Sequence, residues 1–137
     1  MIDSSFRFHG HASLGFVYRQ GRVARTTGCS LKYVPNPRRE RYRAAVVISK
    51  KVSKSAVVRN RIRRRIYEQV RGLMPPHVSY DLVFTVFSAD LALTPEKHIK
   101  DTVSRLLQVS GILEGEGRGT VENSADQPAD VKNYITN

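Results

Sequence analysis

Residues 49–68 read SKKVSKSAVVRNRIRRRIYE and hold the most informative pattern of the chain. On a helix that turns about 100° per residue, aliphatic side chains of this segment fill one arc and polar side chains fill the opposite arc. The apolar arc comprises Val58, Ile62, Ile66, Val70 and Leu73, and the opposite arc comprises Asn60, Arg61, Arg64, Tyr67 and Arg71. Ser55 can cap the first turn, and Gly72 with Pro75 and Pro76 can end the helix. We predict an amphipathic helix that buries aliphatic residues and displays guanidinium groups.

Strand patterns lie on both sides of this helix. Residues 43–49 hold an apolar, partly β-branched run from Ala44 to Ile48, which predicts a central strand that is buried on both faces or nearly so. Residues 80–87 alternate in the same β-like manner and predict a further strand. Residues 29–33 alternate apolar with polar side chains before Pro35 and Pro37, which predicts a half-buried strand, and a weaker strand covers residues 22–26.

Two more helices complete the predicted order. Residues 12–20 place Leu14, Val17 and Tyr18 on one side and are followed by Gly21, which can end a helix. Thr94, as N-cap, and Pro95 open a last helix, whose apolar side runs to residue 112. The pattern therefore predicts an α+β fold in which helices pack against one sheet.

Charge divides the chain into a basic body and an acidic tail. The 137 residues include 23 Lys and Arg against 12 Asp and Glu, for a net charge of +11. Residues 1–113 hold 21 basic and 7 acidic side chains, whereas residues 114–137 hold 2 and 5. We predict one RNA-binding domain over residues 1–113 and a disordered, acidic tail over residues 114–137, because the tail has too few apolar residues to form a core.

The basic body indicates a polyanionic partner. Sixteen of the cations are Arg, whose planar fork binds phosphate oxygens in pairs, so nucleic acid is favoured over a membrane. The longest apolar runs, residues 44–48 and 82–87, are far below the roughly 18 residues of a membrane-spanning helix. A single cysteine, Cys29, is typical of a reducing compartment, and we expect a cytoplasmic protein.

Carboxylates are scattered through the body. Two-metal hydrolysis by a protein needs clustered carboxylates, and those of the first 113 residues show no ligand-like spacing. The carboxylates concerned are Asp3, Glu40, Glu68, Asp81, Asp90, Glu96 and Asp101. We therefore predict neither a catalytic residue nor a metal ligand in this chain.

The helix and its flanks resemble the bacterial ribonuclease P protein component. The resemblance rests on a Lys pair after a strand, a short loop and the Arg59-Asn60-Arg61 triplet that opens an amphipathic helix. Upstream, Tyr18-Arg19-Gln20-Gly21 and Leu31-Lys32-Tyr33 fall where that family has its first helix and second strand, and residues 80–84 resemble its fourth strand. The resemblance covers about residues 6 to 113.

What the resemblance implies is a protein subunit of a ribonucleoprotein that removes the 5′ leader from precursor tRNA. In that family the RNA subunit and its substrate hold the catalytic Mg²⁺ and the protein grips RNA, so neither a membrane nor a protein partner is expected. The implied fold is a four-stranded sheet with three helices in the order α-β-β-β-α-β-α. It includes a left-handed crossover at the Arg-rich helix, against the usual right-handed rule.

Candidate contacts follow from the matching positions. The motif residues Arg59, Asn60, Arg61, Arg63 and Arg64 are expected to bind RNA, with Lys50, Lys51 and Lys54 as secondary contacts. Adjacent like charges destabilise a helix without an anion, which argues against a merely solvated face. The family often has Arg where Tyr67 stands, and either Arg65 or Tyr67 could take that contact.

A second predicted surface would bind the single-stranded leader. Tyr18, Leu31 and Tyr33 match positions where the family presents aromatic and apolar groups to unpaired bases, and such stacking tolerates any base. The alternative is that these are ordinary sheet and core residues. Leu14 stands where the family commonly has an aromatic residue.

Two other functions compete with this interpretation. A structural RNA-binding protein, such as a ribosomal protein, would share the size and charge but would not need the second surface. A protein-only nuclease is disfavoured by the scattered carboxylates.

Overall fold

The computed structural model describes residues 11–113, and it describes side chains from Leu14 onward. The elements are α1 (His11–Gln20), β1 (Arg22–Thr26), β2 (Cys29–Pro35), β3 (Arg43–Ile48), α2 (Ala56–Leu73), β4 (Tyr80–Val86), the short 3₁₀ helix η2 (Ala89–Ala92) and α3 (Glu96–Val109). This confirms the predicted α+β class and the order α-β-β-β-α-β-α. Helix η2 was not predicted. The predicted disorder of residues 114–137 lies outside the described residues.

The sheet is mixed, with the strand order β1-β2-β4-β3. The prediction of a central strand over residues 43–49 is therefore wrong in position, because β3 is an edge strand, although its residues are largely buried as expected. Strand β2 pairs antiparallel with both β1 and β4, whereas β3 pairs parallel with β4, in the register that places Val46 opposite Phe84. Parallel neighbours need a crossover connection, and α2 provides it. The crossover at the Arg-rich helix is therefore confirmed, and its left hand stays a prediction.

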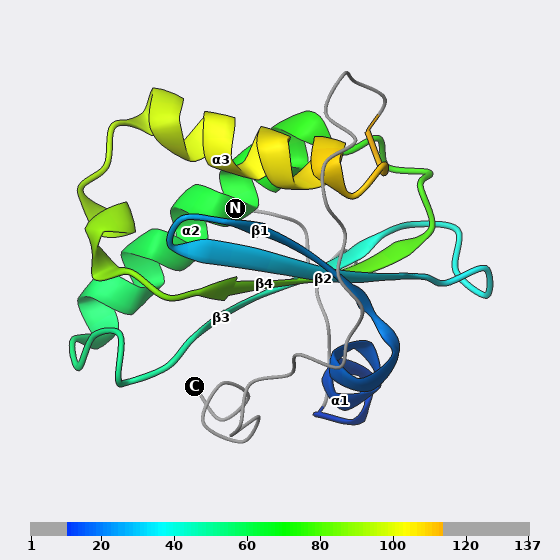
Figure 1. The fold of residues 1–137 in the computed structure, drawn as a ribbon, viewed down its shortest axis with the longest axis horizontal. Helices are drawn as coiled ribbons and strands as arrows, with labels where there is room; N and C mark the ends of the chain where they lie inside the picture. The colour runs from blue at the N-terminus through cyan, green and yellow to red at the C-terminus, as the bar shows by residue number, and fades with distance from the viewer. Residues whose placement is uncertain (1–10, 114–137) are drawn as a thin grey trace.

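Helices cover both faces of this sheet. Figure 1 shows α2 and α3 side by side on one face and α1 on the other. The main core lies under α2 and α3, and a smaller cluster under α1 includes Val17, Tyr18, Ala45, Val47 and Val83. Both helical layers therefore keep the two central strands away from water.

Because helices cover both faces of the sheet, the prediction for residues 29–33 is wrong. They were expected to form a half-buried strand, but every residue from Cys29 to Tyr33 is buried, and even Lys32 is only 4% exposed. The cause is α1, which covers the face that the polar alternation assigned to solvent. Burial also raises the pKa of the Cys29 thiol to about 12.

Two glycines make close chain approaches possible around β1. Gly21 separates α1 from β1, and a Cβ there would lie 2.5 Å from the Val17 carbonyl oxygen. Gly28 closes the β1–β2 hairpin with a φ of +83°, a conformation that side chains disfavour. These positions fix α1 against the sheet and keep β1 in register with β2.

The last helix begins one residue later than predicted. Pro95 occupies the cap position without a side-chain cap, and the Thr94 hydroxyl instead donates to the Asp90 carbonyl at 2.8 Å. Helix α3 ends at Val109, and Ile112 packs against the core from the following turn. None of the helices among residues 11–113 is long and apolar enough to cross a membrane.

Candidate nucleic-acid interface

Helix α2 begins at a well-formed cap. The Ser55 hydroxyl accepts a hydrogen bond from the Val58 amide at 3.2 Å, and the Ser55 amide donates to the Ser53 hydroxyl at 3.2 Å. The first turn of the helix holds no acidic side chain. Its amide groups and partial positive charge therefore add to the charge of the neighbouring Lys and Arg side chains.

Exposed cations gather around this helix start. Arg61 and Arg64 are exposed and lie one turn apart on the outer side of α2, as the sequence predicts. Lys50, Lys51 and Lys54 are exposed in the loop that leads from β3 into the helix. We name these five side chains the α2 cationic face.

The other motif residues flank this face and are held by protein groups. Arg59 is partly buried, and its guanidinium donates to the Ser53 carbonyl at 2.8 Å. The Arg63 guanidinium donates to the Asn60 side-chain oxygen at 2.7 Å and to the Val46 carbonyl at 3.3 Å. Burial is the main reason that the pKa of Arg63 is lowered, although an arginine remains charged at neutral pH. Arg59 and Arg63 therefore support the interface as well as extending it.

Tyr67 departs from the predicted arrangement. The sequence placed it on the exposed arc, but it is buried, and that prediction is wrong. Its hydroxyl accepts from the Val46 amide at 3.2 Å and makes a long contact of 3.5 Å with the Ala44 carbonyl. Strand β3 is an edge of the sheet, so its outward backbone groups need partners, and Tyr67 and Arg63 supply them.

Arg65 also has a structural role. Its guanidinium donates to the Leu91 carbonyl at 2.7 Å and to the Thr94 carbonyl, which ties α2 to η2 and to the turn before α3. The suggestion that Arg65 or Tyr67 takes the RNA contact of the family's Arg is therefore not supported. Both side chains hold the helix in place.

The predicted leader surface does not exist as a surface. Tyr18 is 1%, Leu31 0% and Tyr33 5% exposed. Tyr18 belongs to α1 and packs in the smaller cluster between this helix and the sheet, whereas Leu31 and Tyr33 belong to the main core on the opposite face. The prediction is wrong because Leu31 and Tyr33 share one face of β2, Tyr18 lies on the helix that covers the opposite face, and helices bury both faces.

Tyr18 is held in place by polar groups that the sequence did not single out. Its hydroxyl lies 3.1 Å from the Thr85 hydroxyl, and its carbonyl accepts from the Lys32 ammonium at 3.0 Å. The same ammonium lies 5.4 Å from the centre of the Tyr18 ring. A cation beside the last carbonyls of α1 is favourable, so this lysine supports the fold.

The β2–β3 loop is fixed by an ion pair. The Asp81 carboxylate accepts from the Arg43 guanidinium at 2.8 and 3.0 Å and from the Asn36 amide at 2.9 Å. Asp81 is 3% exposed, so this carboxylate is committed to structure. Within residues 11–113, no three His, Cys, Asp or Glu side chains come close enough together to hold a metal ion. The described donor set does not fit a protein-held Mg²⁺.

Comparison with known proteins places this geometry in a family. The ribonuclease P family model matches residues 3–109. The chain belongs to the ribonuclease P protein family. The ribonuclease P protein component of Chloroflexus aurantiacus is 34% identical over 113 residues, which are 82% of each chain. That of Roseiflexus castenholzii is 39% identical over 100 residues, which are 72% of this chain and 80% of the relative.

Solved structures of ribonuclease P proteins share the fold. The Staphylococcus aureus protein superposes with a TM-score of 0.67 at 18% identity, over 77% of this chain and 94% of that chain. The Thermotoga maritima protein gives 0.65 at 18% identity, over 80% and 98%. The family model and the similar relatives make the chain a protein subunit of ribonuclease P, the endoribonuclease of tRNA 5′ processing, which works with the ribonuclease P RNA on precursor tRNA. Enzymes of this family are generally Mg²⁺-dependent.

Proposed function

We propose that the α2 cationic face is where this ribonuclease P protein binds RNA. Arg61 and Arg64 make the principal phosphate contacts, and Lys50, Lys51 and Lys54 extend them along the loop before α2. Arg59, Asn60 and Arg63 complete the interface at its flanks, where protein hydrogen bonds orient their polar groups. The observation that supports this proposal most directly is that the exposed residues Arg61 and Arg64 lie on a helix that is hydrogen-bonded to the edge strand β3.

The physical reason is preorganisation. A flexible cation loses side-chain entropy on binding, whereas a cation on a fixed helix is already close to its bound position. The bonds from Tyr67 and Arg63 to Val46 keep α2 from rotating against the sheet. Neutralised phosphates release their counterions, which makes such binding strong at low salt.

Bond breaking belongs to the RNA in this proposal. The RNA subunit and the precursor would hold the Mg²⁺ that assists hydrolysis of the phosphodiester by water. The protein reduces phosphate repulsion between the two RNA molecules and so increases the affinity of the complex for its substrate. We place this activity in the cytoplasm, and binding of the 5′ leader is assigned to this protein as well.

Reconstitution of the holoenzyme tests the proposal. Purified protein, cognate RNA subunit and a leader-bearing precursor are combined at low Mg²⁺, and single-turnover cleavage is measured. Cleavage should require both subunits, and Arg64→Glu should reduce it at least tenfold, because it exchanges an attractive phosphate contact of about 1.5–3 kcal/mol for a repulsive one. Arg71→Glu is the control at an exposed position seven residues further along the same helix. Because Arg71 pairs with Glu68 at 2.9 Å, a melting curve checks that this variant remains folded.

The possible outcomes separate the competing functions. Cleavage by the protein alone would identify a protein nuclease. Cleavage that is independent of the protein would favour a purely structural RNA-binding role. Equal losses from Arg64→Glu and Arg71→Glu would show that general charge, and not the α2 cationic face, carries the effect.

A further inference from the structure

The acidic tail, residues 114–137, carries the charge opposite to that of the α2 cationic face. It holds five acidic and two basic side chains. Between the two basic residues, Arg118 and Lys132, three carboxylates follow one another without a cation: Glu122, Asp126 and Asp130. The same chain therefore contains a phosphate-binding surface and a segment of negative charge.

The α2 cationic face has no counter-charge within residues 14–113. The ion pairs that the structure describes there involve Arg43 and Arg71, which are not part of this face. The first turn of α2 holds no acidic side chain, and Arg61 and Arg64 repel each other one turn apart. A guanidinium binds a carboxylate with the same two parallel hydrogen bonds that it makes to a phosphate. A carboxylate can therefore take the place of an RNA phosphate on this face.

The tail begins close enough to reach the start of α2. Leu113 packs against the main core, and its amide donates to the Leu107 carbonyl at 3.2 Å. Helices α2 and α3 lie side by side in Figure 1. The 18 residues of α2 are about 27 Å long, so its start lies on the order of 30 Å from the end of α3. An extended chain covers roughly 30 Å from Leu113 to Glu122 and roughly 55–60 Å from Leu113 to Asp130.

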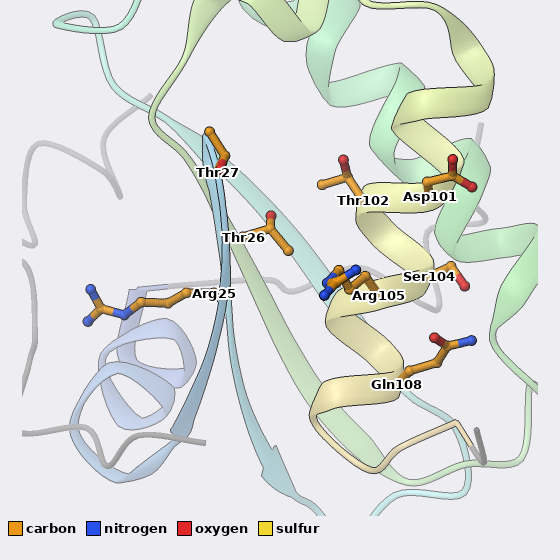
Figure 2. A pocket seen from close by; sticks show the side chains of 8 residues that line it. All are labelled: Arg25, Thr26, Thr27, Asp101, Thr102, Ser104, Arg105 and Gln108. Carbon is orange, nitrogen blue, oxygen red and sulfur yellow. The ribbon is translucent and has the colours of Figure 1, made fainter. Parts of the chain in front are cut away.

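A groove between edge strand β1 and α3 is a second polar surface beside the end of α3. Figure 2 shows Arg105 pointing from α3 toward β1, while Arg25 points away from the gap. Asp101 lies one turn before Arg105 on the same helix and also lines the groove. One guanidinium beside a carboxylate attracts an acidic segment less than the five cations of the α2 cationic face do. Charge therefore favours that face as the partner of the tail, and Arg105 serves as the comparison site.

We propose that the acidic tail binds the α2 cationic face in the absence of RNA and is displaced when RNA binds. The proposal rests on the proposed function, in which this face binds RNA. Each exposed ion pair is weak and screened by salt, but the tail is covalently attached and so acts at a millimolar effective concentration. The tail lowers the affinity of this face for every RNA by one factor. RNA that binds weakly is then released, while the tightly bound RNA subunit stays bound.

The first test measures affinity for the RNA subunit in the full chain. The tail variant Glu122→Gln/Asp126→Asn/Asp130→Asn removes three charges and changes little else. Its affinity should exceed that of the unchanged protein about three- to tenfold at about 0.05 M salt, because the competing contact is lost. At about 0.5 M salt the gain should fall below twofold, since surface charges are then screened. An equal gain at both salt concentrations would contradict an electrostatic contact.

Two controls separate the tail contact from net charge. The body variant Glu40→Gln/Asp90→Asn/Asp101→Asn makes the same charge change at exposed positions of the described domain. Its gain in affinity should be less than twofold, and a gain equal to that of the tail variant would overturn the proposal. In the background Arg61→Ala/Arg64→Ala the tail variant should give a gain of less than twofold. An undiminished gain in that background would place the contact elsewhere.

A measurement without RNA tests the contact itself. The NMR signals of the Arg61 and Arg64 guanidinium groups should differ between the unchanged protein and the tail variant at low salt, and the Arg105 signal should not. Unchanged Arg61 and Arg64 signals, or a change at Arg105 alone, would overturn the proposal. Shifted signals without a gain in RNA affinity would show that the tail does not compete with RNA and would overturn it as well. Failure of the proposed function is distinguishable, because it would appear as undiminished RNA affinity in Arg61→Ala/Arg64→Ala.

Discussion

Helices α1 and α2 cover opposite faces of one sheet and differ in whether their polar side chains point toward solvent or toward the sheet. On α2, Arg61 and Arg64 point outward, and the inward Tyr67 hydroxyl is bonded to the edge of β3. On α1, Tyr18 turns inward and is met by Thr85 and Lys32 beneath the helix. The proposed RNA contacts are therefore limited to the polar side chains that the fold leaves exposed.

The largest expected effect tests the buried side of this comparison. Leu31→Ala should lower the free energy of unfolding by about 2–5 kcal/mol, because it opens a cavity in the main core. Chemical denaturation measures this change directly. The folded fraction should still bind precursor with unchanged affinity. A stable Leu31→Ala protein that binds leader poorly would restore Leu31 as a leader contact.

A smaller effect tests the anchor of α2. Tyr67→Phe removes the hydroxyl that accepts a hydrogen bond from the Val46 amide at the outer edge of β3. The change should lower the free energy of unfolding by about 0.5–1.5 kcal/mol. Because the Val46 amide then loses its partner, α2 should also be held less firmly, and affinity for the RNA subunit should fall about two- to fivefold. Denaturation and RNA titration of the same preparation separate the two quantities.

Tyr18→Phe gives the matched comparison on the other face. It removes the contact of 3.1 Å with the Thr85 hydroxyl and should cost about 1 kcal/mol or less of unfolding free energy. Affinity for the RNA subunit should not change, since α1 does not carry the α2 cationic face. If Tyr18→Phe and Tyr67→Phe weaken RNA binding equally, the anchoring role of Tyr67 has no support.

The fold was largely readable from periodicity. The apolar arc of α2 and the β-branched run of β3 predicted these two elements, because both patterns reflect burial directly. The crossover between β3 and β4 was expected only from the family resemblance. The alternation of polar and apolar residues in β2 led to the wrong prediction of a half-buried strand, since Ser30 and Lys32 are buried beneath α1. Alternation shows that two faces differ in composition. It does not show that one of them meets water when a polar side chain finds partners inside.

The candidate site was predicted unevenly for a related reason. Arg61 and Arg64 were placed correctly because burying two charges without partners is too costly to occur. Tyr67 was placed wrongly because the need of an edge strand for hydrogen-bond partners arises only once β3 is known to be an edge.

The salt dependence of RNA affinity tests the central claim most directly. Binding to the RNA subunit is titrated across a range of salt concentrations for the unchanged protein and for the double variant Arg61→Ala/Arg64→Ala. The account predicts a steep slope for the unchanged protein and a slope shallower by roughly 1.4–1.8 for the variant, because two phosphate contacts are removed. Identical slopes for the two proteins would contradict the assignment of RNA binding to the α2 cationic face.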